Sequence, residues 1–581
     1  MQNYLEDLRS FVAQRLTTDG QVVDFQLEIP PRPEMGDYAL PAFPLAKVMR
    51  RAPQQIAADF AQAWADDADL PSFIERVEAL GPYVNFFLNP VQYTKDILGD
   101  ILRQGQDFGT CEDGAGKTIL VEYSSPNIAK PFHVGHAFST LIGASVARIY
   151  DSLGYDVQRI NHLGDYGTQF GKLIVAYKKW GDEAALKKAP IPELLRVYVK
   201  FHEEAAENEH LEDEARQAFV RLEQGEAEET ALWKEFRDLS IESFNLVYDR
   251  LGITFDSWKG ESFYSDKMGA VIELLDEKGI LEDSEGAKVV RLDEENLPPC
   301  IVVKSDGSSI YATRDLTAAI YRWNTYEFAQ NIYVVGNPQT LHFQQVFAVL
   351  KKAGFEFADR CKHVGFGLVK FPDRIIATRT GDVVHLADLL EQSIAKAREI
   401  IVANAETRGD AFSETELDDV SEKVGIGAVV YLFHKSGRER DIIFRWEDML
   451  DFDGDTGPYL QYTYARCNSM LRKAEEQGLE KTSIEDLAYE RLAEDDVLPL
   501  MKLLAEYPQA VKEAAETYEP FMVGRQVSEI AREFNRYYNA YPILRDEDGE
   551  RRAAKLALCR AVLTVMGSGL NLIGIQPTER I

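Results

Sequence analysis

The sequence is poor in cysteine. Among its 581 residues there are 5 cysteines, which are widely scattered and form no CxxC pair: Cys111, Cys300, Cys361, Cys467 and Cys559. An odd number of scattered cysteines is typical of a reducing compartment and argues against both a disulfide-stabilised scaffold and a structural zinc site. We therefore expect a cytoplasmic protein without a structural metal.

Long apolar runs and a secretory signal are also missing. No stretch approaches the roughly 18 apolar residues of a transmembrane helix. The N-terminal segment MQNYLEDLRSFVAQRL carries Glu6 and Asp7 early and has no apolar core, unlike a signal peptide. We expect no membrane association. The 45% of hydrophobic residues is ordinary for a folded chain, and 581 residues suggest about three to four domains.

Positive charge is scarce, with 64 Lys and Arg against 96 Asp and Glu and a net charge of −32. Such a balance argues against a nucleic-acid partner, because phosphate binding normally requires a basic surface. The excess is local, however: residues 201–300 hold 27 acidic and 10 basic residues, whereas residues 501–581 hold 11 of each. The total charge therefore does not exclude a nucleic acid, which we expect to avoid the acidic helical stretch 203–230.

The hydrophobic pattern places a nucleotide-binding fold after the first 110 residues. TILVEYSS (118–125) fits a buried strand, a one-sided apolar helix follows from about Val134, and DVQRI fits a second strand. This is a βαβ unit, which implies a parallel sheet with a ligand at the carboxyl end of the first strand. Strand patterns return at residues 300–305, 331–336 and 362–369.

Other regions complete an α/β and α multidomain chain. Residues 1–110 alternate helical and strand patterns and end on GPYVNFFLNP, whereas the pattern from residue 396 onward is almost wholly helical. We predict an N-terminal α/β module (1–110), a Rossmann-type nucleotide-binding domain (111–395) interrupted by a helical insertion at about 173–290, and a C-terminal helical domain (396–581).

Two histidines at the predicted helix start are the most informative motif. His133 and His136 stand three apart in KPFHVGH, so both imidazoles lie on one face beside unpaired backbone N–H groups. A helix N-terminus favours phosphate, and Gly135 lets a nucleotide approach the backbone. Two neutral donors there would stabilise a pentavalent α-phosphate better than its ground state. The alternatives are surface histidines or metal ligands, but the position directly after a strand and an SxPN loop favours a nucleotide.

The segment SSPNIAKPFHVGH (124–136) resembles the HIGH signature of class I aminoacyl-tRNA synthetases, in the form found in arginyl-tRNA synthetases. Further similar segments are INHLGDYGTQFGKL (160–173), KSDGSSIYATRDLTAAIYR (304–322), FDGDTGPYLQYTYAR (452–466) and the C-terminal GIQPTERI. The resemblance implies an arginine–tRNA ligase that uses ATP with Mg²⁺, L-arginine and tRNA(Arg), and we expect a monomer. It also implies that the N-terminal module contacts tRNA and that the C-terminal helical domain binds the anticodon.

The resemblance also implies an arginine pocket. Its ligand is a planar cation with five donors, best met by carboxylates and a flat ring. Asp315 would bind the guanidinium, and Glu122 is a second carboxylate candidate. Without the resemblance, the alternative interpretation of Asp315 is a solvated acid in the first turn of a helix, which pairs with Arg314 or with the helix dipole. The remaining residues of the predicted pocket are Tyr311 and Gln339 beside the guanidinium and Ser125, Pro126, Asn127 and His136 around the arginine backbone.

The second class I signature, KMSKS, is eroded. Its lysines hold the β- and γ-phosphates, but the matching loop reads IIATRTGDVV (375–384), with Ile375 and Thr378 at the lysine positions. Arg379 is the cation left inside the motif, and Lys130 is placed to supply a missing charge. We expect the ATP site to consist of Lys130, His133, Gly135, His136, Thr378 and Arg379. The eroded loop leaves open an alternative, a synthetase-like tRNA-binding paralogue without catalysis.

Candidate RNA contacts lie at both ends of the chain. In the N-terminal module they are Asn85, Phe86, Phe87 and Asn89, which would stack and pair with a loop base, although strand alternation places at least one of the two phenylalanines in the core. In the helical domain they are Arg445, Tyr459, Tyr462, Arg466 and Arg532, although aromatic residues at helical spacing are usually core.

Overall fold

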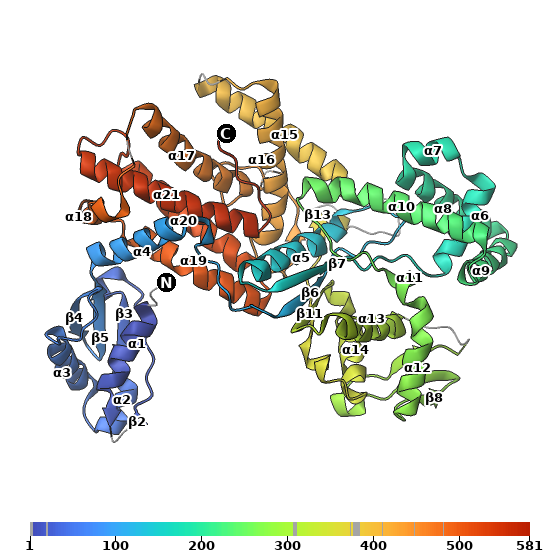
Figure 1. The fold of residues 1–581 in the computed structure, drawn as a ribbon, viewed down its shortest axis with the longest axis horizontal. Coiled ribbons are helices and arrows are strands. Elements are labelled where there is room, and N and C mark those ends of the chain that lie inside the picture. The colour runs from blue at the N-terminus through green and yellow to red at the C-terminus, as the bar shows by residue number, and fades with distance from the viewer. Residues whose placement is uncertain are drawn as a thin grey trace. The chain divides into compact units, whose positions relative to one another are not determined.

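A computed structural model describes residues 4–18, 21–305, 311–371, 374–375, 384–408, 411–446, 448–479 and 481–581 (Figure 1). The chain forms two compact units, each built from segments distant in sequence. Unit 1 comprises Met1–Phe108, Arg466–Tyr507 and Glu529–Met566, and unit 2 comprises Gly109–Ala465, Pro508–Ser528 and Gly567–Ile581.

Unit 1 contains a small antiparallel sheet covered by helices. β5 (Tyr83–Leu88) is its central strand, with β3 (Tyr38–Pro41) and β4 (Ile74–Leu80) as the edges. α3 (Pro53–Ala65) packs on β4 and β5 (Figure 1). This agrees with the α/β module predicted for the first 110 residues. Its other elements are α1 (Tyr4–Arg15), β1 (Thr17–Thr18), β2 (Gln21–Val22), α2 (Phe43–Met49) and α4 (Pro90–Gln104).

The helices predicted for the C-terminal region are present. They are α17 (Gly457–Glu476), α18 (Tyr489–Ala493), α19 (Leu498–Thr517), α20 (Phe521–Ala540) and α21 (Gly549–Leu572). By length and composition α21 could cross a membrane, but 72% of its most apolar 18-residue stretch is buried within the protein. Its Lys555 is buried and forms ion pairs of 2.8 Å with Asp495 and Asp546. α21 therefore has the character of a core helix.

Unit 2 is built on a parallel sheet of four strands in the order β12-β11-β6-β7. The strands are β6 (Thr118–Glu122), β7 (Asp156–Ile160), β11 (Gln330–Val334) and β12 (Cys361–Val364). Helix α5 (Val134–Ser152) connects β6 to β7, and most of it is buried. The crossover unit and the parallel sheet confirm the predicted Rossmann-type fold.

The insertion between β7 and β11 is mostly helical up to residue 277. Its helices are α6 (Thr168–Trp180), α7 (Glu183–Lys188), α8 (Pro190–Glu207), α9 (His210–Glu223), α10 (Ala227–Arg250), α11 (Glu261–Tyr264) and α12 (Met268–Glu277). The end of the predicted helical insertion is not helical: residues 282–290 form β8 (Glu282–Ser284) and β9 (Ala287–Val290) beside β10 (Cys300–Val303). Glu285 and Gly286 have φ of 53° and 81°, so they make the tight hairpin turn that joins β8 to β9.

The rest of unit 2 flanks the parallel sheet. α13 (Tyr311–Tyr326) and α14 (Thr340–Lys352) pack against each other beside β11 (Figure 1). A second small sheet has the order β14-β13-β15. Its strands and the helices that follow are β13 (Val369–Phe371), β14 (Arg374–Ile375), α15 (Leu386–Arg408), α16 (Glu414–His434) and β15 (Ile442–Ile443). The domain boundary placed after residue 395 therefore falls inside α15.

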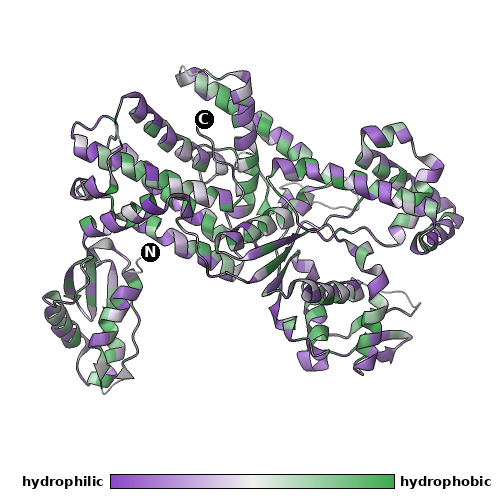
Figure 2. Cartoon of the chain, viewed as in Figure 1, coloured by the Kyte–Doolittle hydropathy of each residue, from purple (hydrophilic) through white to green (hydrophobic). Residues whose placement is uncertain are grey.

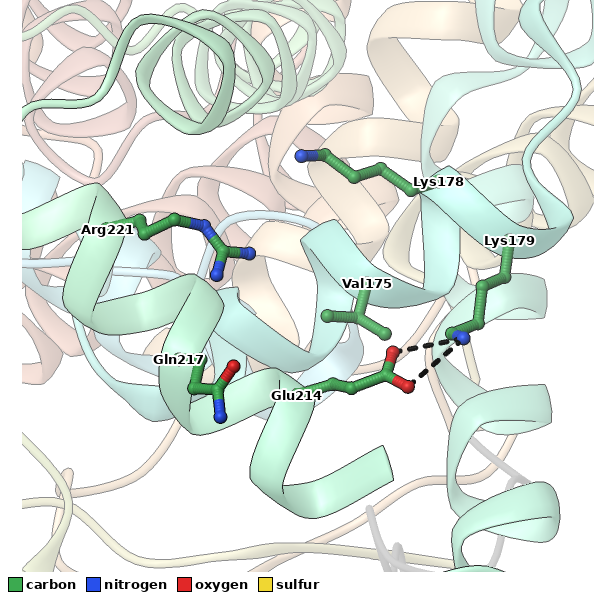
Figure 3. Close-up of a pocket in the computed structure, with 6 residues that line it drawn as sticks. All are labelled: Val175, Lys178, Lys179, Glu214, Gln217 and Arg221. Carbon is green, nitrogen blue, oxygen red and sulfur yellow. Dashed lines mark hydrogen bonds and ion pairs between the residues drawn. The ribbon is translucent and has the colours of Figure 1, made fainter. Parts of the chain in front are cut away.

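The acidic insertion is partly neutralised by ion pairs between its own helices. Glu229 of α10 is buried and pairs at 2.9 Å with both Lys178 of α6 and Arg221 of α9. Hydrophilic residues predominate along α9 in Figure 2. A cavity of about 250 Å³ between α6 and α9 is lined by Val175, Lys178, Lys179, Glu214, Gln217 and Arg221 (Figure 3). Its three basic side chains are all ion-paired, so we interpret the cavity as structural.

Candidate active site

The loop from β6 to α5 is strained. Three non-glycine residues in it have positive φ: Ser124 at 67°, Ser125 at 47° and Ala129 at 60°. Such conformations cost about 1–3 kcal/mol each and persist where the surroundings enforce them. The loop also lies close to residues 161–165, because a Cβ on Gly164 would come within 2.3 Å of the Asn127 side chain. The predicted arginine-binding residues 125–127 therefore sit on an unusual, firmly held backbone.

The two histidines of the HxGH motif cap helix α5. The backbone N–H of Gly135 donates to Nδ1 of His133 at 3.0 Å, and the N–H of His133 donates to Nδ1 of His136 at 3.2 Å. Because Nδ1 is an acceptor in both rings, each neutral imidazole carries its proton on Nε2. The rings are stacked, with centroids 3.8 Å apart. The motif thus holds two stacked imidazoles, each in one defined tautomer.

Both imidazoles are neutral near pH 7. Burial, together with the charges of His385 and Lys130, lowers the pKa of His133 to about 4. Burial, with His133 and Lys130, lowers the pKa of His136 to about 3. Lys130 is exposed, and its charge contributes to the lowered pKa of both rings.

The backbone donors of the helix start are already used, which differs from the prediction. The N–H of Val134 donates to the carbonyl of Val384 at 3.1 Å, and that of His136 donates to the carbonyl of His133 at 2.8 Å. With the N–H of Gly135 bound to His133, the first turn presents imidazole N–H groups to a ligand rather than backbone N–H groups. Val384 is the last residue of the eroded loop and His385 follows it, so the end of this loop pairs directly with the HxGH motif.

The predicted guanidinium ligands have protein partners of different kinds. Asp315 accepts from Nε2 of His342 at 2.5 Å, and both side chains keep 23% of their surface exposed. Glu122 forms an ion pair of 2.5 Å with Arg322, whose side chain is only 1% exposed. The carboxylate of Glu122 is therefore already neutralised by an internal guanidinium. Asp315 remains accessible.

Tyr311 and Gln339 are both accessible. Tyr311 begins α13 with 62% of its surface exposed and lies one turn before Asp315, on the same helix face. Gln339 is exposed at the start of α14. Thr378 and Arg379 lie outside the described residues.

A carboxylate that the sequence did not indicate pairs with Arg314, the residue before Asp315. Glu261 pairs with Arg314 at 3.0 Å, and the Arg314 guanidinium lies over the ring of Tyr311 at 5.1 Å. Burial raises the pKa of Glu261 to about 7; Arg314 opposes this shift, while Asp315 and Asp165 add to it. Arg314 therefore pairs with Glu261, and Asp315 pairs with His342. The alternative interpretation, in which Asp315 pairs with Arg314, does not describe this structure.

A large cavity of about 1070 Å³ adjoins the motif. Helices α8 and α10 supply one side of it, and Phe132 and His385 lie on the other. In the described part of the chain, no group of three or more His, Cys, Asp or Glu side chains is arranged to hold a metal ion.

Comparison with known proteins covers nearly the whole chain. Residues 98–446 match the catalytic domain of class I (R) tRNA synthetases, residues 460–581 the DALR anticodon binding domain, and residues 2–88 the arginyl tRNA synthetase N terminal domain. The chain is 52% identical over 582 residues to an arginine–tRNA ligase of Clostridium perfringens (strain 13 / Type A), which covers 99% of this chain and 100% of that protein. The chain belongs to the arginyl-tRNA synthetase family.

Other relatives agree with this assignment. An arginine–tRNA ligase of Clostridium botulinum (strain Alaska E43 / Type E3) is 48% identical over 580 residues, with 100% of both chains covered. The solved Thermus thermophilus arginyl-tRNA synthetase is 25% identical, with a TM-score of 0.79 and 100% of both chains covered. The predicted class I fold and arginine–tRNA ligase activity are confirmed, and nothing in these similarities favours a paralogue without catalysis. Membership implies tRNA(Arg), arginine and ATP as partners.

The synthetase's N-terminal candidates for RNA contact are engaged within the protein. Phe86 and Phe87 are both buried, and the guanidinium of Arg76 covers the Phe87 ring at 3.7 Å. Asn85 is buried, and the side chain of Asn89 caps α4 by accepting from the next two backbone N–H groups. A stacking role for the two rings is therefore not supported, because β5 is the central strand of its sheet. Phe43, by contrast, is 52% exposed and contacts Tyr83 edge to face, with the ring centroids 5.8 Å apart.

The synthetase's C-terminal candidates differ in exposure. Arg445 and Arg532 are exposed, whereas Tyr459 and Tyr462 are half-buried on α17. Arg466 donates to the Asn535 side chain, and its guanidinium lies 5.0 Å from the ring of Tyr538. The two tyrosines are thus only partly accessible, and the exposed arginines remain the stronger candidates.

Proposed function

We propose that this chain activates arginine with ATP, releases diphosphate, and transfers the arginyl group from arginyl-adenylate to the 3′-terminal ribose of tRNA(Arg). The observation that carries the proposal is the pair of stacked neutral imidazoles at the start of α5, with both Nδ1 atoms engaged as acceptors. The arrangement supplies two Nε2–H donors, without formal positive charge, at the end of a helix.

These donors suit adenylate formation. When the carboxylate of arginine attacks the α-phosphorus, negative charge grows on the non-bridging oxygens as the bond to diphosphate breaks. Neutral, fixed donors bind that growing charge without holding the ground-state triphosphate strongly, so they act mainly on the transition state. His133 and His136 therefore have catalytic roles in this proposal, and Gly135 allows close approach of the nucleotide.

Arginine would bind between the strained loop and the start of α13. Asp315 takes the guanidinium, Tyr311 and Gln339 line the same pocket, and Glu261 adds negative charge next to Asp315. Ser125, Pro126, Asn127 and His136 would hold the backbone of the amino acid. Glu122 acts indirectly here, since its ion pair with Arg322 fixes the carboxyl end of β6.

Glu261 gives the arginine site a pH dependence. With its pKa raised to about 7, Glu261 gains charge as the pH rises through neutrality. Cationic arginine binds the charged form better, so KM for arginine should rise about 3- to 10-fold when the pH falls from 8 to 6. ATP–diphosphate exchange across this range measures the effect. Glu261→Gln should flatten the profile, and an unchanged profile in that variant would exclude Glu261 as its source.

Lys130 and Arg379 would do the work of the missing KMSKS lysines on the β- and γ-phosphates, with Thr378 beside them. Lys130→Ala should lower the rate of arginyl-adenylate formation by roughly 10- to 100-fold, because one charge-assisted contact to phosphate is lost. Single-turnover formation of the adenylate measures this rate. Lys362→Ala, which removes another exposed lysine of the same domain, is the control. A wild-type rate in Lys130→Ala would show that Lys130 does not take this role.

The remaining parts of the proposal concern the setting of the reaction. Mg²⁺ would bridge the phosphates of ATP rather than occupy a protein cage. The chain would work as a cytoplasmic monomer with an N-terminal domain of residues 1–110, a catalytic domain of 111–395 and a helical domain of 396–581. Arg445 and Arg532 would contact tRNA phosphates, and Phe43 with Tyr83 would replace Phe86 and Phe87 as the stacking surface.

Arginine-dependent exchange of labelled diphosphate into ATP tests the proposed chemistry. The exchange should require arginine and should be measured with and without tRNA(Arg), so that a requirement for tRNA is not mistaken for inactivity. Exchange that is absent under both conditions would overturn the proposal.

A further inference from the structure

Helix α10 of the insertion forms hydrogen bonds with both ends of the strained loop. The hydroxyl of Ser240 accepts from the backbone N–H of Ala129 at 3.0 Å, and the hydroxyl of Tyr248 lies 2.7 Å from that of Ser124. Ser240 and Tyr248 are 0% and 1% exposed. They are two turns apart, about 12 Å along one side of the helix. Each contact is made to a residue whose φ is positive.

The position of the Tyr248 hydroxyl is fixed by the residues that pack around its ring and by a hydrogen bond. Its ring packs edge to face against Phe132 at 5.4 Å and against Phe255 at 5.0 Å. The side-chain amide of Asn161 donates to the hydroxyl at 3.2 Å, which leaves the tyrosine proton for Ser124. The position of the hydroxyl is therefore set before any substrate arrives.

The hydrogen bonds continue from Ser124 to the catalytic motif. Thr140 donates to the carbonyl of His136 at 2.7 Å and lies 2.8 Å from the Ser124 hydroxyl. Because a hydroxyl has one proton, Thr140 accepts from Ser124, and Ser124 accepts from Tyr248. A directed chain of hydrogen bonds thus runs from Tyr248 on α10 to the carbonyl of His136. All of these side chains are buried.

We propose that Ser240 and Tyr248 are positioning residues for arginine, which hold the loop of residues 123–129 in its binding conformation. The inference rests on the proposed function, in which Ser125 to Asn127 bind the arginine backbone. Neither side chain needs to touch a substrate. The insertion then does more than connect two strands, because α10 sets the shape of the amino-acid site. The far end of α10 is fixed as well, through buried Glu229 and its ion pairs to α6 and α9.

Tyr248→Phe and Ser240→Ala test the inference in ATP–diphosphate exchange. Each should raise KM for arginine by about 5- to 20-fold, as expected for losing one buried hydrogen bond, while KM for ATP and kcat stay within about threefold. The matched controls are Tyr150→Phe, whose hydroxyl donates to the carbonyl of Ala515 at 3.0 Å, and Ser393→Ala, whose hydroxyl donates to the carbonyl of Gly425 at 2.7 Å. The controls lose a buried hydrogen bond without a contact to the loop.

The melting temperature of all four variants separates positioning from general destabilisation. The inference is supported when the two loop variants raise KM for arginine and the controls, with similar losses of melting temperature, do not. It is overturned if KM for arginine stays within twofold in both loop variants, if KM for ATP rises equally, or if the controls raise KM for arginine to the same extent. A wild-type protein that activates no arginine would instead overturn the proposed function.

Discussion

Replacing Asp315 with Asn should lower kcat/KM for arginine in ATP–diphosphate exchange by roughly 100- to 1000-fold. The guanidinium of the substrate carries a full charge into a site that keeps only 23% of the Asp315 side chain exposed. Removing one partner from such a pair leaves a partly desolvated cation uncompensated, which costs about 3 to 4 kcal/mol. The loss should appear mainly as a higher KM for arginine, because the contact exists both before and during the reaction.

Asp359→Asn is the matched control for this change. Asp359 pairs with Lys351 at 3.3 Å on the surface of the same domain, with 79% of its side chain exposed. Surface pairs of this kind contribute little, so the control should retain wild-type KM and kcat. If Asp315→Asn kept kcat/KM for arginine within tenfold of wild type, the guanidinium would have to bind elsewhere.

Replacing His136 with Ala should reduce kcat for adenylate formation by roughly 100- to 1000-fold, the usual cost of removing one fixed donor to a growing oxyanion. Because His136 acts on the transition state, KM for ATP should change little. The variant also removes the acceptor for the N–H of His133. His136→Asn offers both an acceptor and a donor, so it should recover part of the rate.

His210→Ala provides the control, since His210 is exposed on α9 and pairs with Glu214 at 3.1 Å. It should leave kcat unchanged. A His136→Ala variant with normal kcat and a raised KM for ATP would show that the imidazole binds ground-state ATP instead. Wild-type kcat should also show no titration of these rings between pH 5 and 8, because burial holds the pKa of His133 at about 4 and that of His136 at about 3.

The frame of the catalytic domain could be predicted because its signals are local. TILVE is a continuous apolar run, and all but its first residue are buried in β6. The apolar face of the following helix and the HxGH spacing located α5 and its start correctly. Such patterns depend on residues a few positions apart, so they can be recognised directly in the sequence. The βαβ connection then fixed the parallel arrangement of β6 and β7.

Contacts between distant segments could not be predicted in this way. Glu122 looked like a substrate ligand at the end of a strand, but Arg322, 200 positions later, neutralises it. The first turn of α5 looked open to phosphate, but the carbonyl of Val384 occupies the N–H of Val134. Phe86 and Phe87 are neighbours on a strand, so their side chains point to opposite faces of the sheet. Both are nevertheless buried, because β5 is the central strand, and the sequence does not reveal that position.

The most informative residues missed were those that support the site. Glu261, Ser240 and Tyr248 belong to no recognisable motif, and their partners lie more than 50 residues away. Buried polar groups need partners, but only the folded arrangement shows which ones they find. The net charge of −32 misled for a related reason: part of it lies in an insertion whose carboxylates pair with neighbouring helices.

The central claim is that one site, built on His133, His136 and Asp315, joins arginine and no other amino acid to tRNA. Charging of tRNA with each of the 20 labelled amino acids, in the presence of ATP and Mg²⁺, tests it most directly. Arginine alone should be attached, and Asp315→Asn should abolish most of that signal. Attachment of a different amino acid, or no charging by the wild-type protein, would contradict the account.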